Sequence, residues 1–154
     1  MEIQILNTTL RAIIKSLNCI KGKWAITGGA NHYIRGIIPY INDLDIITSA
    51  ETGRKIADQL DAYLVKDYIY TESEKIRSFF GMFEVNQLPI DLMGDPVNLV
   101  DSTWVSNPYW IDNVEFFNFS GIDVPLTTLD YEMYIYKILG NTERENVLVS
   151  YINN

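Results

Sequence analysis

The sequence predicts an α/β domain of the α+β type, in which helices flank a mixed β-sheet and further helices form the C-terminal end. Apolar residues at spacings of three and four mark helices near both ends of the chain, and short apolar runs mark strands. The middle of the chain changes to a period of two, which is typical of strands. We expect a single domain over residues 1–154, because this length supports one sizeable core and no linker-like run interrupts it.

The first elements alternate between helix and strand. Gly28-Gly29 ends the first apolar strand abruptly, because residues without side chains permit a tight turn. Ser49 has the hydroxyl of a helix N-cap, with Glu51 in the first turn behind it. In order, we expect a helix over 3–17, a strand over 24–27, a helix from Ala30 to Arg35, a strand over 44–48, and a helix from Ser49 to about Leu60.

The later elements are strands followed by helices. We expect strands over 63–71, 76–85, 88–93 and 114–119, an end to the third of these at Asp95-Pro96, and a turn at 121–123. A helix start signal at Thr127–Asp130 and a stop signal at Gly140 predict one helix, and we expect a second over 143–152. The C-terminal helical part is thus expected to cover about 125–154. We assign no chemistry to 97–113, where Trp104 and Trp110 are expected to cover an edge of the core.

Composition excludes several classes of protein. Apolar residues make up 47% of the chain and charged residues 21%, which fits neither a disordered chain nor a membrane protein. The chain has one cysteine, Cys19, and one histidine, His32, so an intrachain disulfide and a Cys/His zinc site are excluded. The N-terminus lacks the pattern of a signal peptide, and we expect no membrane segment and a cytoplasmic location.

The charges are unevenly distributed along the chain. The net charge is −8, and residues 79–136 contain no Lys or Arg. A broad nucleic-acid surface needs clustered cations, so this distribution argues against one. A short basic segment precedes the first strand and keeps a small contact open; it contains Arg11, Lys15, Lys21 and Lys23.

Three carboxylates are the candidate catalytic groups. Asp43 and Asp45 are two residues apart at a strand, so their side chains project from the same face. Asp91 stands among apolar residues on a strand that should be adjacent, and could complete a site for Mg²⁺ or Mn²⁺. Alternatively, Asp43 caps a turn, while Asp45 and Asp91 face solvent.

Gly28-Gly29 is the candidate phosphate-binding element. It follows a strand and opens a helix, so backbone N–H groups and the positive end of the helix dipole would face an anion such as a triphosphate. The alternative is a helix N-terminus that simply needs a tight turn.

Taken together, these motifs resemble those of the nucleotidyltransferase superfamily that includes DNA polymerase beta. The matching segments are Thr27-Gly28-Gly29, thirteen intervening residues, Asp43-Leu44-Asp45, and then Ile90-Asp91-Leu92. The resemblance covers residues 23–93 well and extends more weakly from Val124 to Lys137. Gly29 stands where many members have Ser, which favours the branch of small lincosamide-type and abortive-infection-type enzymes.

The resemblance implies a nucleotidyltransferase fold and a two-metal mechanism. Asp43 and Asp45 would bridge two Mg²⁺ ions, and Asp91 would bind the second ion and help to deprotonate the acceptor hydroxyl. Lys137 and Arg35 are further candidates for contact with the nucleotide phosphates, although each could instead be a surface residue. His32 is expected at the surface, since this chemistry needs no imidazole, and Tyr33, Tyr131, Tyr134 and Tyr136 either stack on a base or fill the core.

The implied activity is transfer of a nucleoside monophosphate from an NTP to a hydroxyl of a small molecule, with release of pyrophosphate. Two alternatives are kept: nucleotidylation of tRNA or of a partner protein, as in toxin or antitoxin enzymes, and a degenerate module that binds nucleotide without catalysis. The first alternative predicts a basic surface around Lys15, Lys21 and Lys23. A homodimer through the C-terminal helices is kept beside a monomer.

Overall fold

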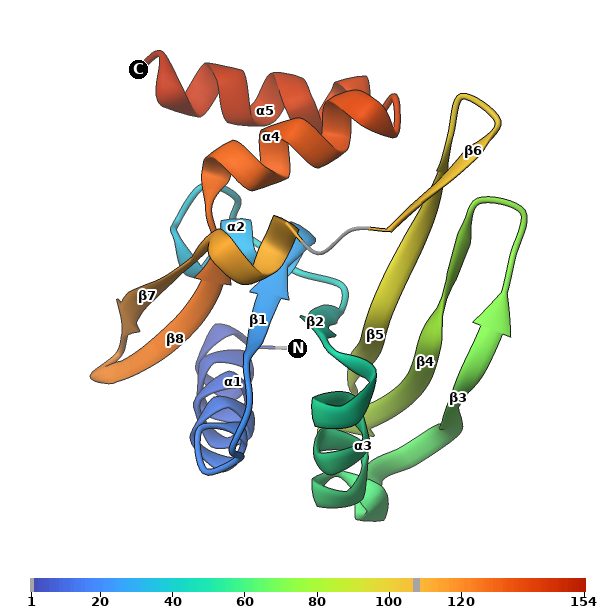
Figure 1. The fold of residues 1–154 in the computed structure, drawn as a ribbon. Helices are drawn as coiled ribbons and strands as arrows, with labels where there is room; N and C mark the ends of the chain where they lie inside the picture. The colour runs from blue at the N-terminus through green and yellow to red at the C-terminus, as the bar shows by residue number, and fades with distance from the viewer. Residues whose placement is uncertain (1, 107–108) are drawn as a thin grey trace.

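The computed structural model describes residues 2–106 and 109–154, while Met1, Asn107 and Pro108 lie outside the described residues. Within these ranges an eight-stranded mixed sheet has the order β3-β4-β5-β2-β1-β8-β7, with β6 paired to β5 (Figure 1). The strands are β1 Trp24–Thr27, β2 Leu44–Thr48, β3 Leu64–Glu72, β4 Ile76–Val85, β5 Leu88–Val100, β6 Thr103–Ser106, β7 Val114–Phe119 and β8 Ile122–Thr127. The α-helices are α1 Ile3–Leu17, α2 Gly28–Ile34, α3 Ala50–Gln59, α4 Leu129–Ile138 and α5 Thr142–Ile152, and short 3₁₀ turns cover Asp61–Tyr63 and Tyr109–Asp112.

The first half of the chain folds as predicted. The apolar stripe of α1 is buried, and β1, β2 and α3 lie where the pattern placed them. Ser49 caps α3, because its hydroxyl oxygen accepts the backbone N–H of Thr52 at 3.1 Å. α2 begins at Gly28, two residues before the predicted start at Ala30. Gly28 has φ +71°, a conformation that glycine adopts without strain, so the chain turns directly from β1 into the helix.

The predicted end of a strand at Asp95-Pro96 is wrong, since β5 continues to Val100. The register changes from Phe79↔Gly94 to Arg77↔Val97, so Asp95 and Pro96 form a β-bulge opposite a single residue of β4. Proline is tolerated at a bulge because the ladder is already interrupted there. The chain then turns at 101–102, where both residues have positive φ, and β6 pairs with the end of β5. This hairpin lies within 97–113, where the sequence pattern does not predict a strand.

The predicted helical part from 125 is also wrong at its start. Residues 122–127 form β8, which pairs antiparallel with β7 and parallel with β1 at Ile26↔Leu126. Pro125 marks a strand here, and α4 begins only after Thr128, whose hydroxyl oxygen accepts the N–H of Tyr131 at 3.2 Å. The helical region is therefore 129–152.

The sheet separates two unequal apolar layers. The main core lies between the sheet and the helices α1 and α3, and includes Leu10, Ile26 and Leu92. A smaller cluster lies on the other face, where Ala25, Ile47, Trp110 and Tyr131 pack together. α4 and α5 lie side by side at one end of the sheet (Figure 1). α4 contributes Tyr131 and Ile135 to the smaller cluster, on the face that carries Ala25 and Ile47.

The two tryptophans that we expected to cover an edge of the core, Trp104 and Trp110, differ in position. Trp110 is buried in the smaller cluster, whereas Trp104 is half-buried on β6 with the guanidinium of Arg77 3.8 Å from its ring centre. Among the described residues, no helix combines the length and the hydropathy that crossing a membrane requires.

Candidate active site

The structure brings together the three carboxylates that the sequence indicates. β2 and β5 are parallel neighbours in register, with Asp45 opposite Asp91, and Asp43 immediately precedes β2. One carboxylate oxygen from each of the three residues lies within 4.8 Å of the other two. All three residues are partly buried, so solvent still reaches the cluster.

These carboxylates repel one another in the absence of a cation. Burial, followed by the charges of Asp43 and Asp91, raises the pKa of Asp45 to about 7, although Arg144 opposes the shift. Burial and the charge of Asp43 also raise the pKa of Asp91. Oδ1 of Asp91 is buried and has no hydrogen-bond partner among the described residues. An oxygen-only donor set with an unpartnered buried oxygen suits a hard divalent cation such as Mg²⁺ or Mn²⁺.

The Gly28-Gly29 turn lies directly against this cluster. A Cβ atom on Gly28 would stand 3.1 Å from Oδ2 of Asp45, and one on Gly29 would stand 3.6 Å from Nη1 of Arg144. The absence of side chains therefore allows the carboxylate and the guanidinium to approach the backbone. The N–H of Gly28 is already engaged, because it donates to Oε1 of Glu132 at 2.7 Å.

Glu132, which sequence reasoning missed, is the buried acid of the site. Glu132 lies on α4 and is only 1% exposed. The carboxylate also accepts from Nδ2 of Asn31 at 3.0 Å and from Oγ1 of Thr27 at 3.2 Å. Burial raises its pKa, while hydrogen bonds from Gly28, Thr127 and Thr27 and the charge of Arg144 oppose the shift. Its spacing of four from the buried Tyr136 was the available signal, since it places an acid on the inward face of the helix.

Arg144, also missed, is the cation of the site. It lies in the first turn of α5, and its charge acts on Asp45 and on Glu132. Nothing local in the sequence distinguishes it from a surface arginine, because only the packing of α5 on α4 aims it at the carboxylates.

Two predicted phosphate-binding residues lie elsewhere. Arg35 pairs with Glu115 at 2.7 Å and donates to the carbonyl of Thr127 at 3.0 Å, which ties α2 to β7 and β8. The side chain of Lys137 is 67% exposed, with Nζ 3.9 Å from Oε2 of Glu145. The structure does not bring either residue to the carboxylate cluster, and their contact with a nucleotide stays a prediction.

The expected surface position of His32 is wrong. His32 is 2% exposed, and burial, with smaller effects of Arg144 and Arg35, lowers its pKa to about 4, so the ring is neutral. Its Nε2 has no hydrogen-bond partner among the described residues. Of the tyrosines, Tyr131 and Tyr136 fill the interior as one interpretation predicted, whereas Tyr134 is exposed.

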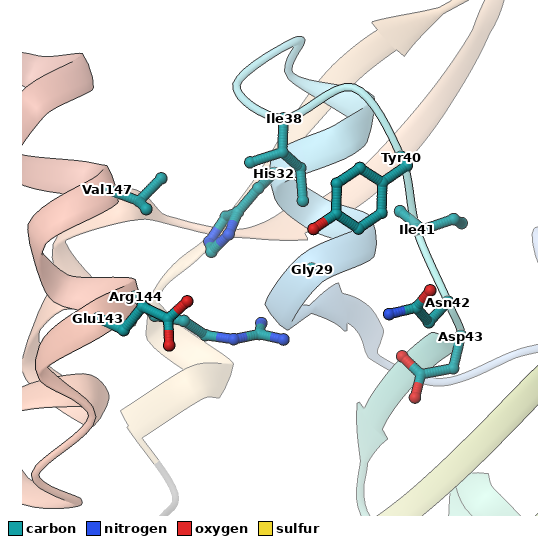
Figure 2. Close-up of a pocket in the computed structure, with 10 residues that line it drawn as sticks. All are labelled: Gly29, His32, Ile38, Tyr40, Ile41, Asn42, Asp43, Glu143, Arg144 and Val147. Atoms are coloured by element: carbon teal, nitrogen blue, oxygen red, sulfur yellow. The ribbon is translucent and has the colours of Figure 1, made fainter.

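Two cavities meet at the cluster. One, of about 230 Å³, is shown in Figure 2, where the Arg144 side chain reaches from α5 toward Asp43 below the ring of His32. The other, of about 320 Å³, lies on the side of Asp45 and is lined by Glu132 and by apolar residues of β2, β5 and α4. Arg144 lines both cavities, so a two-part ligand or two ligands could meet beside its guanidinium.

Comparison with known proteins identifies the fold. No family model matches the sequence, and no curated protein matches it. A candidate nucleotidyltransferase from Thermotoga maritima, known from its crystal structure, superposes with a TM-score of 0.83 at 26% identity, covering 99% of this chain and 96% of its own.

Two antibiotic-modifying proteins have the same architecture. Lincosamide antibiotic adenylyltransferase LnuA, with lincomycin bound, has a TM-score of 0.60 at 13% identity, over 93% of this chain and 96% of its own. The antibiotic-resistance factor ANT(2'')-Ia has a TM-score of 0.64 at 10% identity, over 98% of this chain and 86% of its own. The fold expected from the motifs is therefore confirmed over nearly the whole chain.

Proposed function

The chain has the fold of the nucleotidyltransferases, enzymes that transfer nucleotidyl groups, and on that premise we propose that it moves a nucleoside monophosphate from an NTP to a hydroxyl of a small molecule. The observation that carries this proposal is the cluster of Asp43, Asp45 and Asp91 beside the Gly28-Gly29 turn. Divalent cations held by the three aspartates would neutralise the phosphates and lower the pKa of the acceptor hydroxyl.

The chain's own residues have separate tasks in this reaction. The oxygen of the acceptor attacks the α-phosphorus, the bond from that phosphorus to the pyrophosphate oxygen breaks, and pyrophosphate leaves. The proton of the acceptor hydroxyl passes to the carboxylate of Asp91. Burial raises the pKa of Asp91, which makes it a stronger base than an exposed aspartate.

The cavities favour a small acceptor over a nucleic acid. Among the described residues that line them, Arg144 is the one lysine or arginine, whereas a polyanion would need several. The larger cavity combines Asp45 and Glu132 with apolar walls, which suits an acceptor that carries hydrogen-bond donors on an apolar body.

The first test is calorimetric titration of the protein with ATP, GTP, CTP and UTP, with and without Mg²⁺. We expect one or more triphosphates to bind only with the metal, and the double variant Asp43→Asn with Asp45→Asn to lose that binding. The matched control is Asp61→Asn with Asp67→Asn, which removes two exposed carboxylates outside the site.

Release of pyrophosphate then tests the transfer itself. The first acceptors to test are lincomycin, which is bound in the LnuA structure, and tobramycin, whose adenylyl derivative is bound in a structure of ANT(2'')-Ia. A folded wild-type protein that binds no triphosphate, or whose binding the double variant retains, would contradict the proposal.

A further inference from the structure

In the described part of the chain, Arg144 is the one arginine or lysine that lines the two cavities beside the carboxylate cluster. Its guanidinium lies over the turn that would hold the phosphates, 3.6 Å from a Cβ placed on either Gly28 or Gly29. It also lines the cavities on both sides of the carboxylate cluster (Figure 2).

This guanidinium is held near acids without being paired to any of them. Among the described residues, its side chain makes no ion pair within 4.0 Å, although its charge lowers the pKa of both Asp45 and Glu132. Arg35 is committed to Glu115 and Lys137 lies beside Glu145. Of these three cations, Arg144 is the one without an ion pair, although it interacts with the hydroxyl of Tyr136, and a guanidinium fork matches phosphate oxygens.

A second unsatisfied group faces the same space. The ring of His32 points into the cavity of Figure 2, close to the Arg144 side chain, and its buried Nε2 lacks a hydrogen-bond partner among the described residues. This nitrogen lies 3.7 Å from Oε1 of Glu132, so the ring of His32 separates that buried carboxylate from the cavity that Arg144 lines.

We propose that Arg144 binds the phosphates of the nucleotide, and that before the nucleotide arrives it acts as the counter-ion of the aspartates and opposes binding of a free divalent cation. This inference rests on the proposed function. Because the nucleotide draws the guanidinium onto its own phosphates, the metal binds together with the nucleotide and only weakly without it.

The test measures two affinities whose changes have opposite signs. In Arg144→Gln, tripolyphosphate and ATP with Mg²⁺ should bind about tenfold to a hundredfold more weakly, because charge-assisted hydrogen bonds to phosphate are lost. Mn²⁺ alone should bind about threefold to tenfold more tightly, because a like charge is removed. Both titrations are run near about pH 8.5, where the raised pKa of Asp45 leaves the carboxylate ionised.

Three further variants sharpen the result. Arg144→Lys keeps the charge but not the fork, so we expect Mn²⁺ binding as in wild type and an intermediate affinity for tripolyphosphate. Lys137→Gln in parallel decides between the two candidate cations. Arg11→Gln removes an exposed arginine of α1 and serves as the matched control.

The outcomes separate the two proposals. A wild type that binds ATP with Mg²⁺, beside an Arg144→Gln variant that binds it equally well, overturns the inference and leaves the proposed function in place. A variant in which both affinities fall together shows a structural role and also overturns it. A wild type that binds no triphosphate contradicts the proposed function and the phosphate part, while the Mn²⁺ titration still decides the counter-ion part.

Discussion

At the scale of single residues, Glu132 fixes the junction between β1 and α2. Its carboxylate accepts hydrogen bonds from the side chain of Thr27, the backbone of Gly28 and the side chain of Asn31. These three donors lie within residues 27–31, so the single buried carboxylate of Glu132 holds the glycine turn in position beside Asp45. Charge-assisted hydrogen bonds of this kind are among the stronger ones in proteins.

Truncation of this residue should therefore be costly. We expect Glu132→Ala to lower the free energy of unfolding by about 3 kcal/mol, because the buried donors lose their acceptor. Urea denaturation measures the change. Asp130→Ala, an exposed acid in the same helical turn, should cost less than about 1 kcal/mol. Equal losses in the two variants would contradict a special role for Glu132.

At the scale of elements, two glycines allow α3 to lie close to the sheet. A Cβ atom on Gly53 of α3 or on Gly94 of β5 would overlap the hydroxyl of Tyr68, which comes from β3. That hydroxyl donates to the carbonyl of Ala50 at 3.1 Å. Tyr68 thus fills a space that both glycines leave open, and α3 packs on β3 and β5 through it.

Gly53→Ala tests this packing against helix propensity. Alanine in the middle of a helix gains about 1 kcal/mol over glycine, but the overlap with Tyr68 should reverse the sign and destabilise the protein by about 2 kcal/mol. Thermal or urea unfolding of the variant gives the value. In a Tyr68→Leu background the same substitution should cost much less, and an unchanged cost would show that the tyrosine is not the obstacle.

At the scale of the whole molecule, the site works against stability. The chain has a net charge of −8, and the three aspartates converge with Glu132 on one end of the sheet. The raised pKa of Asp45 means that the folded protein favours its protonated form. Ionisation of this cluster therefore costs folding free energy until a cation binds.

The raised pKa of Asp45 should contribute a loss of stability in the metal-free protein as the pH rises from about 4 to about 7. In that window the folded state holds a proton on Asp45 that the unfolded state has lost, and each pKa unit corresponds to about 1.4 kcal/mol. Unfolding curves across the window, with and without Mg²⁺, measure the slope. Mg²⁺ should restore stability near about pH 7 and flatten the slope, because bound metal favours the ionised carboxylates.

His32 contributes in the opposite direction and has to be separated. Its pKa of about 4 lies below the ordinary 6.5. The stability that the neutral ring contributes is therefore fully present above pH 6.5 and is lost as the pH falls toward about 4. Subtracting the Asp45→Asn curve from the wild-type curve removes the contributions of His32, Asp91 and Glu132, and the difference should fall as the pH rises from about 4 to about 7. Parallel curves for the two proteins across this window would show that Asp45 does not titrate with a raised pKa.

Local signals explain which parts of the fold could be predicted. Ser49 is recognisable as an N-cap from its hydroxyl and the residues behind it, and the period of the apolar residues fixes α1, β1 and β2. The aspartates could be grouped because their strand positions give their faces, and the motif spacing gives the fold. The helices, strands and caps depend only on residues close together in the chain, whereas the grouping of Asp91 with Asp43 and Asp45 depends on the long-range spacing of the motif.

The remaining features depend on distant residues. Pro125 indicates the end of a strand or the approach of a helix, but β8 forms because β1 offers it a free edge about a hundred residues away in sequence. The extension of β5 past Pro96 requires a bulge against β4. Arg144 reaches the aspartates only because α5 folds back over α4, which no spacing within α5 reveals.

Ribosomal synthesis delivers the strands of this sheet out of their spatial order. β8 is the last of the described strands to emerge, yet it pairs with β1, which emerges first. Until residues 122–127 appear, the nascent sheet has an open edge at β1, and the aspartates of β2 and β5 are already in place without Glu132 and Arg144. Residues 122–152 thus cover the open edge of β1 and bring the cation Arg144 to the aspartates.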